Sequence, residues 1–374
     1  MRIAILGAGP AGLYLAYLLK RRRPDADVTV VEQNPADATF GFGVVFSDRA
    51  LEFLRADDPE TYDAITPQME AWSDITLVHK NERIAIDGIG FAAVGRLKLL
   101  QLLQARVRAV GVTPQFGRAV TSLDALPEAD LVVGADGLNS LVRRSFADDF
   151  KPAVTLLNNR FAWFGTSKVF DTLTQTFRHT PIGDFNAHHY RYAPGRSTFI
   201  VETDEESFRR AGFERMDEGD ARALCEKVFA DALGGARLIS NNSIWRRFPQ
   251  LHTERWHRGK HVILGDAAHT AHFSIGSGTR LAMEDAIALE RALHESGDDV
   301  ARALPAYEAA RRPVVDKIVQ GANASAAWYE DFAAHMELAP RDFAMSYIQR
   351  SGRVDIERLR KISPKFVATV AGDA

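Results

Sequence analysis

The sequence has a single cysteine, Cys225, among its 374 residues. One cysteine excludes an internal disulfide framework, a CxxC redox pair and a cysteine-rich zinc site. The chain also has no apolar run of the roughly 18 residues that a membrane-spanning helix needs. It has no excess of charge of either sign, because 46 Lys and Arg stand against 49 Asp and Glu, for a net charge of -3. Without a basic excess, a dedicated nucleic-acid-binding protein is excluded.

The overall composition, with 46% apolar and 25% charged residues, is typical of a globular protein. At roughly 150 residues a domain, the length corresponds to about two and a half domains. The choice is therefore one large α/β domain or two domains that share an interface. The N-terminal residues 1–7 (MRIAILG) place a glycine where a signal peptide would have its apolar segment. We expect a cytoplasmic protein with no nucleic-acid or membrane partner and no bound metal.

The N-terminal residues predict a βαβ unit. Residues 2–6 (RIAIL) form the continuous apolar run of a strand buried on both faces, and residues 27–32 (DVTVVE) form a second such strand. A helix is expected between them from Pro10 to Arg22. Further buried strands are expected at residues 130–135 and 261–264, and helices at residues 96–110, 279–295 and 299–337.

A different pattern begins at about residue 153. Segments 160–168 (RFAWFGTSK) and 197–203 (STFIVET) are rich in aromatic and β-branched residues, and turn residues stand between them at 181–184 and 194–195. This pattern predicts an antiparallel sheet inserted into the α/β domain. The predicted fold is therefore α/β, with a split Rossmann-like domain, an inserted antiparallel sheet domain and a C-terminal helical region. The boundaries are 1–70, 95–150 and 255–300 for the split domain, 71–94 and 151–254 for the inserted domain, and 301–374 for the helical region.

The first chemical motif is residues 7–12 (GAGPAG), a GxGxxG between a strand and a helix. Gly7 allows the tight turn, Gly9 lets the backbone approach a pyrophosphate, and Gly12 allows close packing of helix and strand. The diphosphate would lie at the helix N-terminus, where free N–H groups favour negative charge. Glu32 ends the second strand and would accept hydrogen bonds from an adenosine ribose. A carboxylate there disfavours a 2′-phosphate, so the sequence predicts FAD or NAD rather than NADP.

Two further motifs follow in order, residues 130–143 (DLVVGADGLNSLVR) and residues 265–269 (GDAAH), the latter succeeded by residues 276–278 (GSG) and Asp285. With the GxGxxG, they resemble the FAD-dependent aromatic hydroxylases related to p-hydroxybenzoate hydroxylase. The resemblance implies that the split domain binds FAD and that the inserted sheet forms the substrate domain. It also implies that NADH or NADPH reduces the flavin and that O2 then gives a flavin C4a-hydroperoxide, which hydroxylates an aromatic ring.

The same resemblance places the FAD. Asp266 would bond the ribityl chain, Arg96 would lie near the diphosphate, and Asp136 with Gly137 would serve the diphosphate region and the nicotinamide nucleotide. The loop through Thr279 would lie against the flavin ring. The residues expected to hold FAD are Gly7, Gly9, Pro10, Ala11, Gly12, Glu32, Gln33, Arg96, Asp136, Asp266, Gly276, Gly278 and Thr279.

Departures from the general family pattern indicate a subgroup. Phe273 and Arg280 stand where the family usually has proline and asparagine. Residues 269–279 (HTAHFSIGSGT), 41–46 (GFGVVF) and 163–167 (WFGTS) resemble a group that includes salicylyl-CoA 5-hydroxylase, the hydroxylase half of anthraniloyl-CoA monooxygenase and the hydroxylase of violacein biosynthesis. We expect no second reductase domain, because the sequence ends at Ala374. The resemblance then implies hydroxylation of salicylyl-CoA at position 5, giving gentisyl-CoA.

A base near the phenol would increase the electron density of the ring and speed oxygen transfer. We expect His272 to be this base or an orienting donor, because histidine titrates near neutral pH and because this residue lies in the loop that resembles the flavin-facing one. His188 and Phe273 are expected to contact the substrate. His188 and His189 are adjacent on a strand, so at most one points into the cavity. The CoA phosphates would need cations, and the candidates are the dibasic pairs Arg143-Arg144, Arg209-Arg210 and Arg246-Arg247.

Three alternatives stay open from the sequence. One is hydroxylation of a free indole, a tryptophan-derived compound or another aromatic substrate by the same mechanism. A second is an NAD-dependent reductase that uses only the first motif, although residues 265–269 have no role around NAD alone. A third is a non-catalytic module with the FAD fold. The C-terminal helices could pack on the flavin domain or pair two subunits, so both a monomer and a homodimer are expected possibilities.

Overall fold

The N-terminal strand and helix form the α/β unit that the apolar pattern predicts. In the computed structural model, which describes residues 1–47 and 51–371, β1 (Arg2–Leu6) pairs in parallel with β2 (Asp27–Val31). Helix α1 (Pro10–Arg22) connects them, and every residue of β1 after Arg2 is buried. Burial of a strand on both faces is what its continuous apolar sequence requires.

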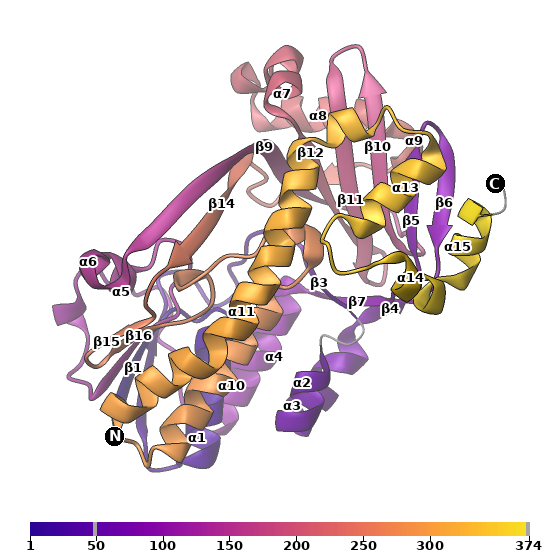
Figure 1. Ribbon diagram of the computed structural model, residues 1–374. Helices are drawn as coiled ribbons and strands as arrows, with labels where there is room; N and C mark the ends of the chain where they lie inside the picture. Colours follow the sequence, from indigo (N-terminus) through magenta and orange to yellow (C-terminus); the bar gives the residue numbers. More distant parts are fainter. Residues whose placement is uncertain (48–50, 372–374) are drawn as a thin grey trace.

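The first lobe is built on a five-stranded sheet in the order β15-β16-β8-β1-β2. The strands β8, β1, β2 and β16 are parallel to one another, and β15 is antiparallel to β16. The added strands are β8 (Leu131–Gly134), β15 (His257–Arg258) and β16 (His261–Ile263). Helices α1, α4 (Arg96–Ala109), α10 (Gly278–Glu295) and the first half of α11 (Val300–Glu330) lie together in this lobe (Figure 1). The sheet thus takes strands from three separate stretches of the sequence.

The second lobe contains the large sheet, in the order β13-β9-β12-β11-β10-β5-β6, with β14 also paired to β9. Its strands are β5 (Ile75–His79), β6 (Glu82–Ile86), β9 (Pro152–Thr166), β10 (Leu173–Thr180), β11 (Gly183–Ala193), β12 (Arg196–Thr203), β13 (Leu238–Ile239) and β14 (Arg246–Thr253). All its pairs are antiparallel except β5 with β10, which run parallel. The expected sheet is therefore present but mixed, because β5 enters from a distant part of the chain and not through a hairpin with β10.

A three-stranded sheet, β3-β7-β4, lies between the lobes (Figure 1). It comprises β3 (Gly43–Ser47), β4 (Glu70–Trp72) and β7 (Phe91–Gly95), and α2 (Glu52–Asp57) and α3 (Pro59–Ile65) lie beside it. β7 runs directly into α4, so it delivers Arg96 to the boundary between the lobes.

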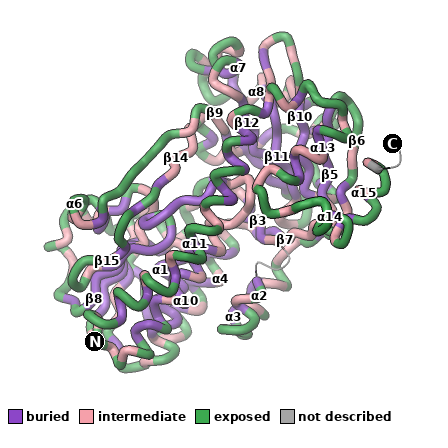
Figure 2. The backbone as a smooth tube through the Cα atoms, viewed as in Figure 1, coloured by how far each residue is buried: buried purple, intermediate pink, exposed green. Residues whose placement is uncertain are grey.

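Helices cover both faces of the large sheet. On one face, α7 (Glu205–Ala211), α8 (Glu218–Val228) and α9 (Ala230–Leu233) enclose an apolar cluster that includes Phe164, Phe185 and Phe199. The other face packs against the end of α11 and the C-terminal helices, with Phe177 in contact with Trp328 and Phe343. Figure 2 shows buried residues in the interiors of both lobes, whereas the first half of β9, paired with β14, is mostly exposed. The remaining helices are α5 (Leu141–Ser145), α6 (Ala147–Phe150), α12 (Phe332–His335), α13 (Pro340–Gln349), α14 (Ile356–Ile362) and α15 (Pro364–Ala371).

The expected helix over residues 299–337 is present as α11 and α12, which meet at Asp331. None of the helices in the described part of the chain has the length and apolar character that a membrane span requires.

Candidate active site

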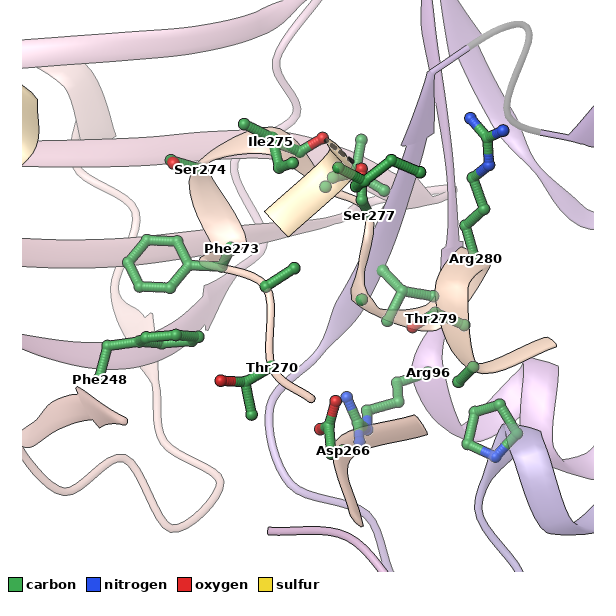
Figure 3. Close-up of a pocket in the computed structure, with 18 of the residues that line it drawn as sticks. Arg96, Phe248, Asp266, Thr270, Phe273, Ser274, Ile275, Ser277, Thr279 and Arg280 are labelled. Carbon is green, nitrogen blue, oxygen red and sulfur yellow. Dashed lines mark hydrogen bonds between the residues drawn. The ribbon is translucent and has the colours of Figure 1, made fainter. Parts of the chain in front are cut away.

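A cleft of about 2070 Å³ is lined by residues from both lobes. The first lobe contributes the turn after β1 and the loop before α10, and the second contributes side chains of β9, β10 and β11. Figure 3 shows Arg96 and Asp266 side by side below this loop, with the rings of Phe248 and Phe273 to one side, set edge to face. The cleft brings together every residue that the sequence assigns to FAD or to the substrate ring, except Gly12 and His272.

The turn after β1 explains the three glycines of the first motif. Gly7 has φ +97°, and a Cβ there would stand 2.2 Å from the carbonyl oxygen of Ala135. A Cβ on Gly12 would stand 2.0 Å from the carbonyl oxygen of Gly7, so this glycine allows α1 to pack against the turn. Gly9 has no protein atom within 4 Å of its Cβ position. The backbone at Gly9 is therefore open to the cleft, at the N-terminus of a 13-residue helix that has no side-chain cap.

Glu32 lies at the end of β2 with its carboxylate already oriented. One oxygen accepts from the backbone N–H of Ala8 at 2.9 Å, and the other accepts from Asn34 at 2.9 Å (backbone N) and 2.7 Å (Nδ2). Each carboxylate oxygen can accept more than one hydrogen bond, so the group can also receive ribose hydroxyls. Gln33 lines the cleft beside it.

Asp136 follows β8 and has two different oxygens. Oδ2 accepts from the backbone N–H of Leu141 at 2.6 Å, which fixes the start of α5. Oδ1 is buried without a hydrogen-bond partner among the described residues. Burial raises the pKa of Asp136, and the hydrogen bonds from Ser140 and Leu141 oppose this. Because buried polar atoms in proteins are almost always hydrogen-bonded, Oδ1 of Asp136 is expected to accept a hydrogen bond from a group bound in the cleft.

Arg96 and Asp266 approach each other across the cleft (Figure 3). Arg96 is the first residue of α4, and Asp266 lies in the 3-10 turn η5 (Gly265–Ala267). Withdrawal from water lowers the pKa of Arg96, and the charge of Asp266 opposes this shift. The same withdrawal raises the pKa of Asp266, again opposed by Arg96. The pair offers one cation and one acceptor to a polar, phosphate-bearing ligand.

A buried ion network holds the η5 turn in place. The Oδ2 atom of Asp285 accepts from the backbone N–H of Gly265 at 2.9 Å and from Nε2 of His269 at 2.8 Å. Its Oδ1 atom accepts from Nε of Arg311 on α11 at 2.6 Å. Burial would raise the pKa of Asp285, but His269 and Arg311 outweigh it and the pKa is lowered. Asp285 therefore positions Asp266 indirectly, because it holds the backbone of the η5 turn that contains Asp266.

The loop from Phe273 to Thr279 approaches β3 closely. Gly276 has φ +62°, and a Cβ there would stand 2.9 Å from Cγ1 of Val45. Ser277 donates to the carbonyl of Ile275 at 3.4 Å, and Gly278 begins α10 (Figure 3). From Gly276 to Thr279 the loop presents backbone and small side chains to the cleft, as a flat ring system lying against it requires.

The two other segments that resemble the subgroup pack on each other. A Cβ on Gly165 would stand 2.5 Å from the ring of Phe42, and a Cβ on Gly41 would stand 2.7 Å from the ring of Trp163. Each segment, 41–46 and 163–167, thus has a glycine that leaves room for an aromatic ring of the other segment. The contact lies where the two lobes meet.

His188 lines the cleft, and His189 points to the opposite face of the sheet. His189 stacks on Phe199 with ring centroids 5.0 Å apart, inside the apolar cluster of α7–α9. In His188, Nε2 lies 3.3 Å from Oε2 of Glu202 on β12, and Nδ1 has no hydrogen-bond partner among the described residues. The alternation of a strand explains this division.

Glu202 is 2% exposed and was not identified from the sequence. Its Oε1 atom accepts from Nδ2 of Asn159 at 3.0 Å. Burial raises the pKa of Glu202 to about 7, while the nearby His272 opposes the shift. Burial also lowers the pKa of His188 to about 3, with the charge of Arg350 acting in the same direction. No sequence signal marks Glu202, because its pairing depends on the register between β11 and β12.

His272 does not line the cleft. It is 1% exposed, and its Nδ1 lies 2.8 Å from the hydroxyl of Ser274, which in turn lies 2.8 Å from the hydroxyl of Ser325 on α11. Its ring is enclosed by Phe248 and Tyr329. Burial lowers the pKa of His272 to about 4. This placement makes it a support of the loop that carries Phe273.

Phe273 belongs to an aromatic wall. Its ring centroid lies 4.9 Å from Phe161, 5.3 Å from His188 and 6.0 Å from Phe248. Phe161 and Phe248 come from the neighbouring strands β9 and β14, and their contribution to the site was not visible in the sequence.

The dibasic pairs differ in where they lie. Arg209 and Arg210 lie on α7 and are not among the lining residues. Arg143 donates to the carbonyl of Ala267 at 2.7 Å, so it supports the η5 turn. Arg246, Arg247 and Arg144 line the cleft, but Arg247 is bound to carbonyls of β9.

Comparison with known proteins agrees with this arrangement. Residues 1–322 match the sequence model of a family described as FAD binding domain. A salicyloyl-CoA 5-hydroxylase from a Streptomyces species is 45% identical over 361 residues, which cover 94% of this chain and 70% of that protein. A 3-hydroxy-4-methyl-anthranilyl-(aryl-carrier protein) 5-monooxygenase from Streptosporangium sibiricum is 38% identical, covering 88% of this chain and 89% of that protein.

Among solved structures, a variant of 2-methyl-3-hydroxypyridine-5-carboxylic acid oxygenase superposes with a TM-score of 0.71. It is 21% identical and covers 94% of this chain and 96% of that chain. At this identity the likeness establishes the fold.

Proposed function

We propose that the substrate of this chain is salicylyl-CoA (salicyloyl-CoA), hydroxylated at position 5 to give gentisyl-CoA. The premise is that the chain belongs to the FAD binding domain family and is a flavoprotein aromatic monooxygenase. FAD is the cofactor, NADH or NADPH the reductant and O2 the source of the added oxygen. The observation that carries the substrate proposal is His188 in the wall of the cleft, with the buried carboxylate of Glu202 behind it 3.3 Å from Nε2. A buried acceptor suits a ring that bears a hydroxyl group.

The residues of the first lobe fit FAD. The open backbone at Gly9 and the guanidinium of Arg96 suit the diphosphate, and Glu32 suits the adenosine ribose. Asp266 suits the ribityl hydroxyls, and the unpartnered Oδ1 of Asp136 can accept from a further donor of the ligand. When bound, FAD supplies the redox chemistry and the activation of oxygen. The chain's own side chains bind it, orient the substrate ring and hold the phenolic proton.

The aromatic wall of Phe161, Phe248 and Phe273 orients the substrate ring and limits the access of water. The ring hydroxyl increases electron density at the carbon para to it, which is position 5 of a salicylyl group. Ionisation of the phenol increases this density further, so a proton acceptor beside the ring favours oxygen transfer at that carbon.

Glu202 determines whether Nδ1 of His188 can accept the phenolic proton, because His188 then passes its Nε2 proton to Glu202 and stays neutral. With Glu202 ionised, Nε2–H of His188 donates to the carboxylate and Nδ1 is left as an acceptor for the phenol. With Glu202 protonated, the carboxyl donates to Nε2, and Nδ1 then carries a hydrogen. The groups that face Glu202 are His188 and Asn186 on β11, His272 in the loop, Asn159 on β9 and Glu330 on α11.

The test is turnover of salicylyl-CoA by the FAD-loaded enzyme, with product identified by mass spectrometry and NAD(P)H consumption measured in parallel. We expect 5-hydroxylation, and a Glu202→Gln variant should lower kcat by on the order of 10²-fold while flavin reduction by NAD(P)H changes little. His188→Gln should behave in the same way.

The matched comparison is His272→Gln, which lies behind the wall and should have a smaller effect on kcat at equal FAD content. If salicylyl-CoA does not stimulate NAD(P)H oxidation but free salicylate or an indole does, the substrate proposal is wrong. If His272→Gln lowers kcat while Glu202→Gln and His188→Gln do not, the proton acceptor is wrongly assigned.

A further inference from the structure

Four cationic side chains line one part of the cleft. One of them follows the glycine-rich residues 276–278, and the other three are distant in sequence from every cofactor motif. Arg280 is in the first turn of α10 and Lys317 is on α11. Arg353 is in the loop between α13 and α14, and Arg358 is on α14. Three stretches of the chain thus bring cations to one wall. We refer to Arg280, Lys317, Arg353 and Arg358 as the cation cluster.

Two members of the cluster, Arg353 and Arg358, are held by backbone carbonyls of other members. Arg353 donates from Nη2 to the carbonyl of Lys317 at 2.7 Å, and Arg358 donates from Nη1 to the carbonyl of Arg353 at 3.2 Å. Gly321, one turn after Lys317, makes room for this: a Cβ there would stand 2.5 Å from Nε of Arg353. Ordered cations of this kind have lost part of the side-chain entropy that binding would otherwise cost.

The charge of the cluster is not balanced. Arg280 pairs with Glu284 at 2.7 Å, but across residues 1–47 and 51–371 no ion pair involves Lys317, Arg353 or Arg358. Partial burial, and then the charges of Arg280 and Arg358, lower the pKa of Arg353. Like charges held together cost free energy, and an anion bound among them would relieve that cost.

The cluster is continuous with the substrate end of the cleft. Ile348 and Val354 line the same cleft as the cluster and the aromatic wall, and Val314, one turn before Lys317 on α11, is 46% exposed. Arg350 lies in this stretch but does not belong to the cluster. Its guanidinium lies 3.8 Å from the ring centroid of Tyr347 and donates to the carbonyl of Ser274 at 3.0 Å. The site of the ring and the group of cations therefore belong to one continuous cleft, with apolar side chains in its lining.

From this arrangement we propose that the cation cluster binds the phosphate groups of the 3′-phosphoadenosine diphosphate part of an acyl-CoA substrate. The inference rests on the proposed function, since it concerns the remote end of the same thioester. The diphosphate and the 3′-phosphate supply several negative charges, which match the unbalanced cations. The apolar side chains beside Lys317 offer a surface to the adenine.

The direct test measures binding of adenosine 3′,5′-bisphosphate to the FAD-loaded enzyme by calorimetry, with no turnover required. Wild type should bind it, and Arg353→Gln and Arg358→Gln should each weaken binding by at least about 10-fold. Gly321→Ala should weaken it as well, because the added methyl displaces Arg353 without removing a charge. Arg360→Gln is the matched control, since Arg360 is exposed on the same helix as Arg358 and pairs with Glu357.

A kinetic test compares salicylyl-CoA with salicylyl-pantetheine, which lacks the nucleotide. In wild type the kcat/KM for salicylyl-CoA should exceed that for the pantetheine thioester by on the order of 10-fold or more, and Arg353→Gln should reduce this ratio. The ratio should stay at its wild-type value in Arg360→Gln.

The outcomes separate the two proposals. If wild type does not bind the bisphosphate, or if Arg353→Gln and Arg358→Gln bind it as tightly as Arg360→Gln, the assignment of the cluster is overturned. It is also overturned if the thioester is accepted only on a carrier protein. If the bisphosphate binds through the cluster but salicylyl-CoA is not hydroxylated, the proposed substrate fails and the nucleotide site stands.

Discussion

Gly7 and Gly9 stand two residues apart in the same turn but have different roles. A side chain at Gly7 would meet the backbone of Ala135 and would also require a strained left-handed conformation. Gly9 has φ -74° and ψ -178°, which any residue adopts, and its Cβ position is open. The first glycine is thus required by the fold, and we propose that the second is required by the ligand.

We therefore expect Gly7→Ala to lower the free energy of unfolding by more than about 3 kcal/mol, since strain and a backbone clash act together. Gly9→Ala should change it by less than about 0.5 kcal/mol but weaken FAD binding by on the order of 10-fold, because the methyl occupies the space next to the diphosphate. Thermal unfolding of the apoprotein and flavin fluorescence titration measure the two effects. Equal loss of stability in both variants would contradict this division.

Glu202 makes stability depend on pH in a defined direction. Its pKa in the folded protein is about 7 against an ordinary value of 4.5. Between these values the folded state keeps a proton that the unfolded state has lost, so stability decreases as pH rises through this window. Glu202→Gln should remove this part of the dependence, seen as a flatter plot of unfolding free energy against pH. Activity should change in the opposite sense, rising through pH 7 as Glu202 ionises.

These residues differ in how far they could be predicted. Gly7, Gly9 and Glu32 are predicted from the sequence because strand, turn and helix are adjacent and their spacing encodes the geometry, whereas Asp266 is predicted from the family resemblance. Glu202 was not found, because its partner lies on another strand. His272 was expected in the cleft as a base, but it lies behind the wall as the N-terminal cap of the short turn η6 (Phe273–Ile275).

At the scale of elements, α10 and α11 are held to the η5 turn by a single buried carboxylate. Asp285 bonds Gly265, His269 and Arg311, which belong to the turn, the loop after it and α11. The sequence marked Asp285 as part of a motif but could not supply this role, since Arg311 is distant in the chain.

Asp285→Asn should destabilise the protein by about 3–5 kcal/mol, because it leaves Arg311 buried without its main counter-charge. FAD content should fall as well, since Asp266 stands on the turn that Asp285 fixes. Chemical denaturation and the flavin-to-protein absorbance ratio measure these effects. Glu295→Gln, at an exposed position of the same helix, is the control and should leave both at wild-type values; a similar loss there would remove the special role of Asp285.

At the scale of the whole molecule, the cleft joins two lobes that each have their own sheet. The α/β class, the inserted sheet and the helical C-terminus could be predicted from apolar patterns and turns. The parallel pairing of β5 with β10 could not, because pairing between distant strands leaves no local pattern. The cation cluster also depends on the way α11 and the last helices return to the cleft.

Removal of FAD should lower the melting temperature of the whole chain, because FAD would contact elements of both lobes. At a free concentration 100 times its Kd, a ligand of the folded state adds about 2.7 kcal/mol of stability. Differential scanning fluorimetry of the apoprotein with increasing FAD should show a rising midpoint, and an analogue without the flavin ring should recover only part of the shift. A midpoint that does not depend on FAD would place the ligand elsewhere.

The large sheet takes β5 and β6 from before residue 90 and its other strands from after residue 150. The β5–β6 hairpin closes through Lys80 and Asn81, which have φ of 48° and 64°, so it can form from its own residues. Its parallel partner β10 is made much later, and at roughly 5–20 residues per second a ribosome needs several seconds to reach it. During that interval the nascent chain carries an unpaired apolar strand edge. Synthesis of this protein therefore contains a period in which aggregation competes with folding, and in which a chaperone has a defined segment to protect.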